Sequence, residues 1–202
     1  MAKLTAALLV VDVQNGFIRD ELPVPGGAEV VPVINALMDR FEVVVASQDW
    51  HPADHGSFAS QHPGRNPFEL GELGGRPQVL WPDHCVQGTP GAQLHPALRT
   101  EPLQAIFRKG MDRTVDSYSM FYDNHRHNAS GLSGFLKERG IQTVYVCGLA
   151  FDYCVRYTAL DALDVVSEVI VVEGACRSVS PLTEAQAREE LQARGVRLIH
   201  SL

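Results

Sequence analysis

The stretch TVYVCGLAFDYC at residues 143–154 decides the fold class. It begins with the continuous apolar run Thr143–Cys147 and breaks at Gly148. From residue 155 to residue 166, apolar residues then recur at helical spacing. A continuous run rich in valine is typical of a strand buried on both faces of a parallel sheet. The stretch therefore predicts a buried strand, a short turn and a helix whose first turn carries Cys154.

The rest of the chain repeats this alternation. Further strands are predicted at Ala6–Val11, Val43–Ser47, Leu103–Phe107, Glu168–Val172 and Val196–Ile199. Helices are predicted at Gly27–Asp39, Ser130–Arg139, Cys154–Val166 and Thr183–Arg194. The last of these helices opens with the letters TEAQ, which resemble a capping box. The alternation predicts an α/β protein, a three-layer α/β/α sandwich around a six-stranded, mostly parallel sheet.

Length and composition fit one globular domain over residues 1–202. The chain is 45% hydrophobic and 20% charged, as in ordinary globular proteins, and its length suffices for a substantial core. Residues 49–102 depart from the pattern, because they show little periodicity and contain much Pro, Gly and His. A loop-rich segment of this length is usually functional. We expect it to contribute a metal site or a lid.

The same features exclude several classes of protein. The net charge of −7 and the lack of a Lys/Arg cluster argue against a nucleic-acid binder. No apolar run is long enough to cross a bilayer, and the start of the chain lacks the pattern of a signal peptide. Four cysteines do not make a disulfide framework, so we expect a cytoplasmic protein. The glycine pair Gly26-Gly27 lacks a dinucleotide fingerprint or a P-loop lysine, and we expect no nucleotide cofactor.

Chemically active residues follow four of the predicted strands. The first strand ends at Asp12, the second at Asp49 and His51, the third at Lys109, and the fourth leads to Cys154. In open α/β sheets, sites form beyond the carboxyl ends of the strands. The sequence therefore predicts one site that contains an acid, a metal-binding pair, a lysine and a thiol.

Three of these residues form a plausible nucleophilic set. Backbone N–H groups at a helix start stabilise a thiolate, so Cys154 is a candidate nucleophile, although a free cysteine is also common as a small buried filler. Asp12 can accept the thiol proton and return it to a leaving group, or it can simply cap a turn. Lys109 would stabilise both the carboxylate and the thiolate if it points inward, and would otherwise be a solvated strand end.

Asp49 and His51 form a D-x-H pair. In an extended segment, residues i and i+2 project to the same side, so both can reach one ion. His84 offers a third ligand, and either His55 or His62 is an alternative to it. Two imidazoles and one carboxylate with open positions suit zinc, iron or manganese.

The other cysteines give little support to a thiol redox or metal-carrier protein, which is the second function class we considered. Cys85 adjoins His84, and we do not count it as a ligand because the two cannot easily reach one ion together. Cys147 lies inside the predicted strand before Cys154 and is expected in the core. The chain has no C-x-x-C motif, which a redox pair would need.

With these residues assembled, the chain resembles the nicotinamidases (also called pyrazinamidases) of the isochorismatase-like cysteine hydrolase superfamily. The resemblance runs from Leu8 to near the C-terminus. Its motifs are VDVQNGF (11–17), SQDWHP (47–52), WPDHCV (81–86), KG (109–110), DSYS (116–119) and GLAFDYCV (148–155). Superfamily relatives that act on isochorismate lack both the metal site and the cysteine. The resemblance therefore implies a metal-containing amidohydrolase that converts nicotinamide, and also pyrazinamide, to the acid and ammonia in NAD salvage.

The resemblance also implies roles for individual residues. It implies a catalytic triad of Asp12, Lys109 and Cys154, and a metal ion, zinc before iron or manganese, held by Asp49, His51 and His84. Some relatives use a histidine resembling His55 or His62 as an additional ligand. It implies a cis peptide bond between Leu149 and Ala150, with the backbone N–H groups of Ala150 and Cys154 holding the oxyanion. The substrate ring should pack among Phe17, Trp81 and Tyr118, with Phe121 as the alternative to Tyr118, and with its nitrogen on the metal.

The partner expected from the resemblance is a small amide, and the oligomeric state stays open, with a homo-oligomer among the options. The nearest rival function is another small-amide or N-carbamoyl cysteine hydrolase of the same superfamily. Such relatives share the triad but lack the complete D-x-H and histidine set, so metal content would separate the two functions.

Overall fold

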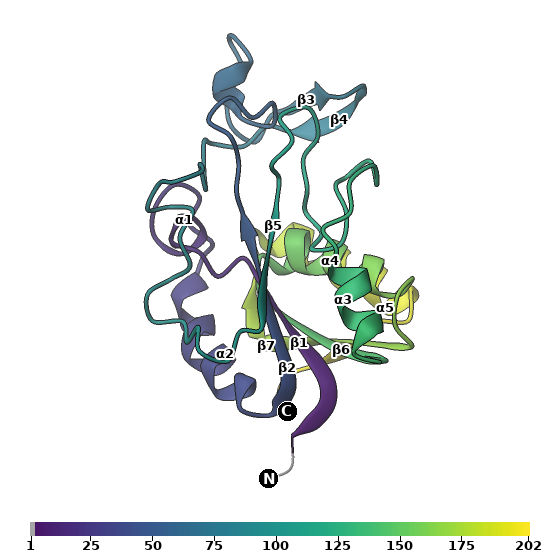
Figure 1. Cartoon of the computed structure of the whole chain (residues 1–202). Coiled ribbons are helices and arrows are strands. Elements are labelled where there is room, and N and C mark those ends of the chain that lie inside the picture. Colours follow the sequence, from purple (N-terminus) through teal and green to yellow (C-terminus); the bar gives the residue numbers. More distant parts are fainter. Residues whose placement is uncertain (1–2) are drawn as a thin grey trace.

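The apolar runs form a six-stranded sheet in the computed structural model, which describes residues 3–202 (Figure 1). Its strands are β1 (Leu4–Val11), β2 (Phe41–Asp49), β5 (Ala105–Lys109), β6 (Thr143–Leu149), β7 (Glu168–Arg177) and β8 (Arg197–Ile199). Their order is β5-β2-β1-β6-β7-β8, and each neighbouring pair is parallel. The predicted sheet is confirmed, and it is wholly rather than mostly parallel.

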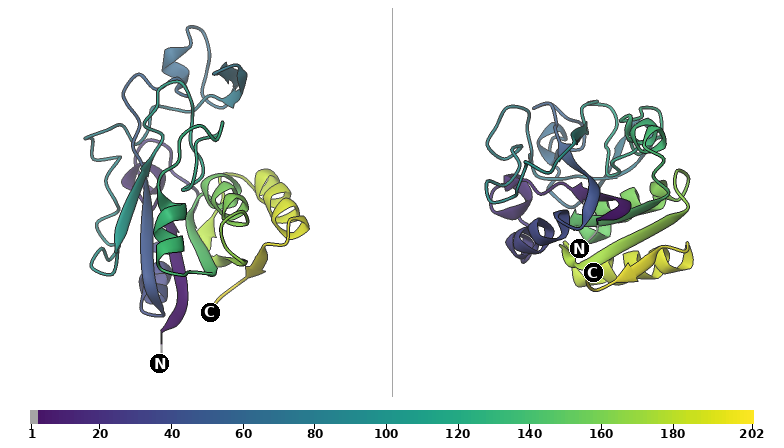
Figure 2. Two further views of the ribbon diagram at one scale, coloured as in Figure 1. Left: turned by 45° about the vertical axis from the view of Figure 1, so that its right-hand side comes forward. Right: turned by 60° about the horizontal axis from the view of Figure 1, so that its bottom comes forward.

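Helices cover both faces of the sheet, which confirms the three-layer prediction. The helical segments are α1 (Asn15–Ile18), η1 (Gly27–Glu29), α2 (Val30–Met38), η2 (Ala59–Gln61), α3 (Leu132–Glu138), η3 (Phe151–Val155), α4 (Arg156–Ala162) and α5 (Pro181–Ala193). Helix α2 lies on one side, and α3, α4 and α5 lie on the other (Figures 1 and 2). Right-handed crossovers explain this division. The connection from β1 to β2 runs toward one edge of the sheet and the connection from β6 to β7 runs toward the other edge, so their helices lie on opposite faces. None of the helices in residues 3–202 has the length and apolar character needed to span a membrane.

The reversal of direction occurs between β1 and β6, at the centre of the sheet. Val11 and Gly148 are register partners at the carboxyl ends of these strands. Gly148 has a φ of 117°, and a Cβ atom there would lie 2.1 Å from the carbonyl oxygen of Val11. Only glycine permits this close approach of the two backbones. A crevice at such a reversal is where open α/β sheets usually bind ligands.

The segment that carries Cys154 differs from the predicted helix start. Residues 151–155 form a π-helical turn, and α4 begins only at Arg156. The N–H of Val155 donates to the carbonyl oxygen of Ala150, five residues earlier, at 3.1 Å. Apolar periodicity does not distinguish a π turn from an α-helical one, which is why the prediction was wrong here. Single π turns occur frequently at functional sites.

Helix α5 also begins earlier than predicted. Its N-cap is Ser180, whose side-chain oxygen accepts a hydrogen bond from the N–H of Thr183 at 3.2 Å, and Pro181 occupies the first turn. The predicted capping box at Thr183 was therefore wrong. The dipeptide Ser180-Pro181 is itself a helix-start signal that could have given the correct boundary.

A two-stranded antiparallel hairpin was not predicted. It consists of β3 (Leu70–Leu73) and β4 (Arg76–Val79), joined by Gly74 and Gly75 with φ values of 58° and 77°. Two central residues with positive φ favour a Gly-Gly turn, so the sequence held a usable signal. The hairpin stands beyond the carboxyl ends of the sheet strands, at the end of the molecule opposite to both termini (Figures 1 and 2).

Candidate active site

Asp12 follows β1 directly and is completely buried. Its φ of 48° lies in the left-handed region, which aspartate tolerates better than most residues. Its N–H donates to the side-chain oxygen of Ser47 at 3.1 Å, and the Ser47 hydroxyl donates to Asp12 Oδ1 at 2.6 Å. Burial raises the pKa of the Asp12 carboxyl. Asp12 is therefore a fixed carboxyl group with a greater affinity for protons than an exposed aspartate.

Lys109, the last residue of β5, points inward rather than into solvent. Its Nζ atom lies 2.9 Å from Asp12 Oδ2 and 2.7 Å from Asp49 Oδ1. It also donates to the carbonyl oxygen of Ser117 at 2.9 Å and contacts Cys154 Sγ at 3.5 Å. Burial lowers the pKa of Lys109, but the Asp12 and Asp49 carboxylates outweigh burial and raise it well above the usual value. The lysine thus remains a cation in contact with both carboxylates and the thiol.

Cys154 is buried within this cluster, and its ligand-forming atom lies within 4.8 Å of a carboxylate oxygen of Asp12. Burial raises the pKa of the Cys154 thiol well above its usual value; Lys109 opposes this rise, and Asp12 adds to it. Burial therefore disfavours the thiolate that was expected at a helix start.

Asp49, His51 and His84 also come together, with their ligand atoms within 4.8 Å of one another. Asp49 Oδ2 lies 3.4 Å from His51 Nε2 and 3.9 Å from His84 Nε2. The Nδ1 atoms of the two histidines lie 2.8 Å from the carbonyl oxygen of Gly110 and 2.7 Å from that of Pro82. A carbonyl can only accept, so each Nδ1 carries a hydrogen and a neutral ring turns the Nε2 lone pair toward Asp49. This donor set fits a divalent cation.

The charges of this cluster agree with that fit. Burial and the neighbouring His51 lower the pKa of His84 to about 4, so His84 is neutral at pH 7. Burial raises the pKa of Asp49, but Lys109 and His51 outweigh burial and lower it below the usual value. Burial lowers the pKa of His51, but Asp49 outweighs it and raises the pKa. His51 Nε2 has no hydrogen-bond partner in residues 3–202, so the space beside Asp49 favours a positive charge, either a proton or a metal ion.

The two alternative histidines differ from His84. His62 uses Nε2 to contact the carbonyl oxygen of Gly56 at 2.7 Å and belongs to none of the ligand clusters in residues 3–202. His55 is buried and clusters with His51 and Asp116, and its Nε2 has no partner in the described chain. His55 Nδ1, however, lies 2.8 Å from the Ser57 hydroxyl and accepts the Ser57 N–H at 3.3 Å, and these contacts favour a ring hydrogen on Nε2. In that tautomer His55 offers no lone pair at Nε2, and His84 is the better ligand.

Cys154, Asp49 and His84 face one narrow, mostly apolar pocket. The predicted substrate residues Phe17, Trp81 and Tyr118 all line it, as does Ala150, which follows the confirmed cis peptide bond. Phe121 is not in the lining and belongs to the buried core.

The pocket wall contains a polar network that the sequence did not predict. Tyr118 Oη accepts hydrogen bonds from Gln78 Nε2 at 3.0 Å and from Trp81 Nε1 at 3.1 Å. Gln78 Nε2 also lies 2.9 Å from Asp116 Oδ2. Because Gln78 belongs to β4, the network attaches the hairpin to the pocket wall.

Other contributors were also missed. The lining further includes Leu22, Val24, Asp116, Tyr153 and Val179. Ser47 could have been found, because it stands two residues before Asp49 on the same strand and therefore faces the same side. No local signal identifies Ser117, which contributes a backbone carbonyl.

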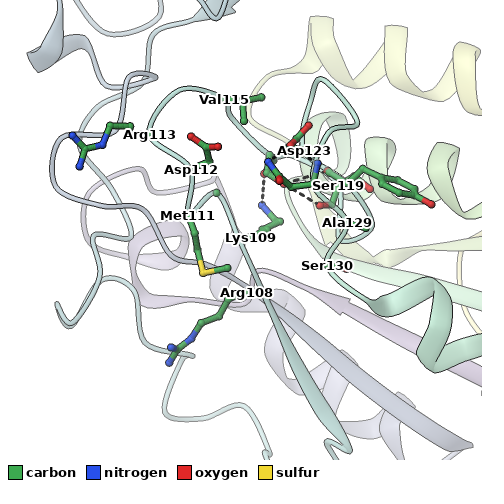
Figure 3. A pocket seen from close by; sticks show the side chains of 14 residues that line it. Arg108, Lys109, Met111, Asp112, Arg113, Val115, Ser119, Asp123, Ala129 and Ser130 are labelled. Carbon is green, nitrogen blue, oxygen red and sulfur yellow. Dashed lines mark hydrogen bonds between the residues drawn. The ribbon is translucent and has the colours of Figure 1, made fainter.

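A larger cavity of about 520 Å³ lies on another side of Lys109, between the segment 108–115 and the loop 117–130 (Figure 3). Neither Cys154 nor the histidine cluster lines it. Two carboxylates line it, and both accept hydrogen bonds from their own loops. Asp112 accepts from the N–H and the hydroxyl of Thr114, and Asp123 accepts from the backbone N–H groups of His125, His127 and Asn128. The chemistry described above therefore belongs to the narrow pocket.

Comparisons with known proteins agree with this geometry. The isochorismatase domain model matches residues 6–201. The nicotinamidase of Acinetobacter baylyi is 49% identical over 197 residues, which cover 96% of this chain and 92% of that protein. The structure of the nicotinamidase/pyrazinamidase of Acinetobacter baumanii is similar with a TM-score of 0.93 and 48% identity, covering 96% of this chain and 95% of the other. A pyrazinamidase of Pyrococcus horikoshii in complex with zinc has a TM-score of 0.79 and 35% identity, covering 97% and 99%.

Proposed function

This chain belongs to the isochorismatase family, and on that premise we propose that it is a nicotinamidase that hydrolyses nicotinamide to nicotinate and ammonia. One observation carries the proposal: a buried thiol with an adjacent carboxyl group and lysine shares a small, largely apolar pocket with a two-histidine, one-carboxylate cluster. Relatives named nicotinamidase support it at 49% identity over almost the whole chain. The reaction belongs to NAD salvage, and pyrazinamide is a second substrate by the same chemistry.

In the proposed mechanism Cys154 is the nucleophile and Asp12 is the base. Asp12 takes the thiol proton, and the sulfur forms a bond to the amide carbon. The backbone N–H groups of Ala150 and Cys154 hold the oxyanion, a contribution of roughly 3–4 kcal/mol per donor in comparable sites. Asp12 then gives its proton to the leaving nitrogen, the C–N bond breaks, and ammonia departs from the thioester.

The second half of the reaction restores the enzyme. A water molecule loses a proton to Asp12 and attacks the thioester carbon, and the C–S bond breaks to release the acid and the thiol. Lys109 remains charged throughout and lowers the cost of the thiolate and of the Asp12 carboxylate. Burial raises the pKa of the Cys154 thiol, which supports giving Asp12 the role of base.

One divalent metal ion completes the proposed site, with Asp49, His51 and His84 as its ligands. Zinc is the first choice and iron or manganese the alternatives; a zinc-bound pyrazinamidase among the similar structures supports zinc. When bound, the metal supplies a Lewis-acidic anchor for a ring nitrogen of the substrate. Phe17, Trp81 and Tyr118 hold the ring itself. We further propose that residues 1–202 act as one hydrolase domain, with the segment 49–102 contributing to the metal site and the lid.

The test is ammonia release from nicotinamide and from pyrazinamide, with metal content measured on the same preparation. Wild type should release ammonia from both amides, Cys154→Ala should release none, and the wild-type thioester should be trapped by rapid acid quench and seen by mass spectrometry. Ammonia release from an N-carbamoyl amino acid alone would instead identify the rival hydrolase. Turnover by Cys154→Ala would contradict the covalent mechanism.

A further inference from the structure

Asp152 is a buried carboxylate in the π turn, two residues before Cys154, and its side chain is saturated with hydrogen bonds. It accepts the N–H of Val179 at 3.0 and 3.1 Å on its two oxygens and the N–H of Ser180 at 3.3 Å. The Thr183 hydroxyl also donates to Oδ2. Within residues 3–202 Asp152 forms no salt bridge, so neutral donors alone compensate for its burial.

The three donor residues share one location, the start of α5. Ser180 is the N-cap of this helix, Val179 precedes it, and Thr183 lies in its first turn. The first N–H groups of a helix lack partners within the helix and favour a negative charge. The Asp152 carboxylate therefore accepts hydrogen bonds from the start of α5, although it belongs to a distant segment of the chain. These bonds fix η3 to the start of that helix.

Both ends of this connection adjoin the pocket. Cys154 lines it on the η3 side, and Val179 lines it on the α5 side. Within residues 3–202, the one hydrogen bond of Cys154 Sγ is that from Lys109 Nζ at 3.5 Å. The distance from Sγ to Asp12 depends on where η3 lies. A small shift of η3 would therefore separate the thiol from its base while leaving the rest of the sheet intact.

We propose that Asp152 is a positioning residue, which holds η3 against α5 so that Cys154 Sγ stays within reach of Asp12 and Lys109. The kinetic part of this inference rests on the proposed function. Its rival is a purely structural link that stabilises the fold without affecting the thiol.

The chain offers a matched control for that rival. Arg156, at the start of α4, forms an ion pair with Glu190 of α5. This pair connects α5 to the segment just after η3, as Asp152 connects α5 to η3, but neither residue lines the pocket. Glu190→Gln therefore weakens the attachment of α5 without freeing the π turn.

The experiment compares wild type with Asp152→Asn, Thr183→Val and Glu190→Gln. Asp152→Asn places a side-chain NH₂ group, which can only donate, beside the donors of Val179, Ser180 and Thr183. The substitution should therefore weaken the attachment of η3 to α5. For this variant we expect kcat for nicotinamide to fall by about 100-fold, with KM nearly unchanged, because a misplacement of about 1 Å has that effect on rate. Alkylation of Cys154 by iodoacetamide, followed by mass spectrometry of the intact protein, should slow as well, since a thiol that no longer meets Asp12 stays protonated. Glu190→Gln should lower Tm but retain wild-type kcat and wild-type alkylation.

Thr183→Val is a milder variant that can be used if Asp152→Asn fails to fold. It removes the hydroxyl that donates to Asp152 and leaves the backbone N–H donors of Val179 and Ser180 in place. It should reduce kcat and alkylation less than Asp152→Asn does, and the double variant should be no worse than Asp152→Asn alone, since both changes break one connection. Wild-type kcat and alkylation in folded Asp152→Asn or in Thr183→Val would overturn the inference. So would an equal loss of kcat in Glu190→Gln.

The alkylation comparison needs no substrate. If wild type releases no ammonia from nicotinamide, the proposed function fails, but the alkylation rates of the variants still decide whether Asp152 positions Cys154.

Discussion

The Nζ atom of Lys109 lies 2.7 Å from Oδ1 of Asp49, so one buried lysine connects the thiol and its base to the histidine cluster. This contact occupies one oxygen of the Asp49 carboxylate. The other oxygen, Oδ2, faces the histidines. The lysine therefore balances the negative charges of the two aspartates beside the histidine cluster.

Lys109→Met should damage both stability and catalysis. The substitution leaves Asp12 and Asp49 buried without their cation, and breaking a buried charge pair in this way typically costs about 3–5 kcal/mol. Urea unfolding measures the loss, and ammonia release should fall to background. The control, Lys137→Met, changes an exposed lysine of α3 and should leave both the unfolding free energy and the rate of ammonia release at the wild-type values. Equal unfolding free energies for the two variants would contradict the role given to Lys109.

Ser47→Ala should move the acid limb of kcat/KM to higher pH. Asp12 must be deprotonated to act as base, so activity falls as the pH drops through its pKa. Burial already raises that pKa, and the Ser47 hydrogen bond lowers it, so removal of the hydroxyl raises it further. A hydrogen bond to a charged group contributes roughly 1.5 kcal/mol, which corresponds to about one pH unit.

The measurement for Ser47→Ala is a pH profile of kcat/KM at saturating metal. Ser133→Ala on α3 is the control and should keep the wild-type limb. An unchanged or lower limb in Ser47→Ala would argue that Asp12 is not the titrating base.

Metal content should distinguish the histidines. His84→Ala removes an Nε2 lone pair that faces Asp49, so purified protein should lose most of its bound metal and bind added zinc at least about tenfold more weakly, as loss of a ligand does. His62→Ala should keep one metal per chain, because His62 Nε2 is engaged by the carbonyl of Gly56. Elemental analysis by mass spectrometry measures both. Full metal content in His84→Ala would point to His55 as the ligand instead.

Tyr118→Phe should weaken substrate binding. The change removes the acceptor that fixes the Trp81 ring in the pocket wall, so the contacts of Trp81 and residue 118 with the substrate ring should weaken. A loss of about 1.4 kcal/mol in binding would raise KM roughly tenfold. Phe121→Leu should lower the free energy of unfolding but leave KM unchanged, since Phe121 lies in the core. Steady-state kinetics with nicotinamide distinguish the two. An unchanged KM in Tyr118→Phe together with a raised KM in Phe121→Leu would make Phe121 the residue that contacts the substrate ring.

Apolar runs were sufficient to predict a six-stranded sheet and the alternation of strands and helices along the chain, but not the order of the strands in the sheet. Strands buried on both faces leave a strong pattern, and the carboxyl ends of parallel strands meet on one edge, so Asp12, Asp49, Lys109 and Cys154 could be grouped before any coordinates. The histidine cluster could be predicted only in part. The choice among His84, His55 and His62 depends on which ring nitrogen is hydrogen-bonded to a backbone carbonyl or N–H group. No sequence motif marks the residues that supply those backbone groups.

The remaining errors have one physical source: local signals were outweighed by tertiary contacts. A helix start favours a thiolate, but burial raises the pKa of the Cys154 thiol. A π turn replaces the predicted first turn of α4, and its position depends on Asp152 and the start of α5. Gln78 could not be linked to Tyr118 because nothing in the sequence gives the place of the hairpin over the pocket.

The strand order has a consequence for how the enzyme reaches activity. Asp12 follows the first strand of the sheet, and Cys154 follows the fourth, yet the two strands lie side by side. Every pairing in the sheet is parallel and closes a long loop of chain, which gives a high contact order and predicts slow folding. Asp12, the proposed base, and Cys154, the proposed nucleophile, are far apart in the sequence and meet only when β1 pairs with β6. Catalytic competence should therefore emerge late in refolding, after most of the secondary structure has formed.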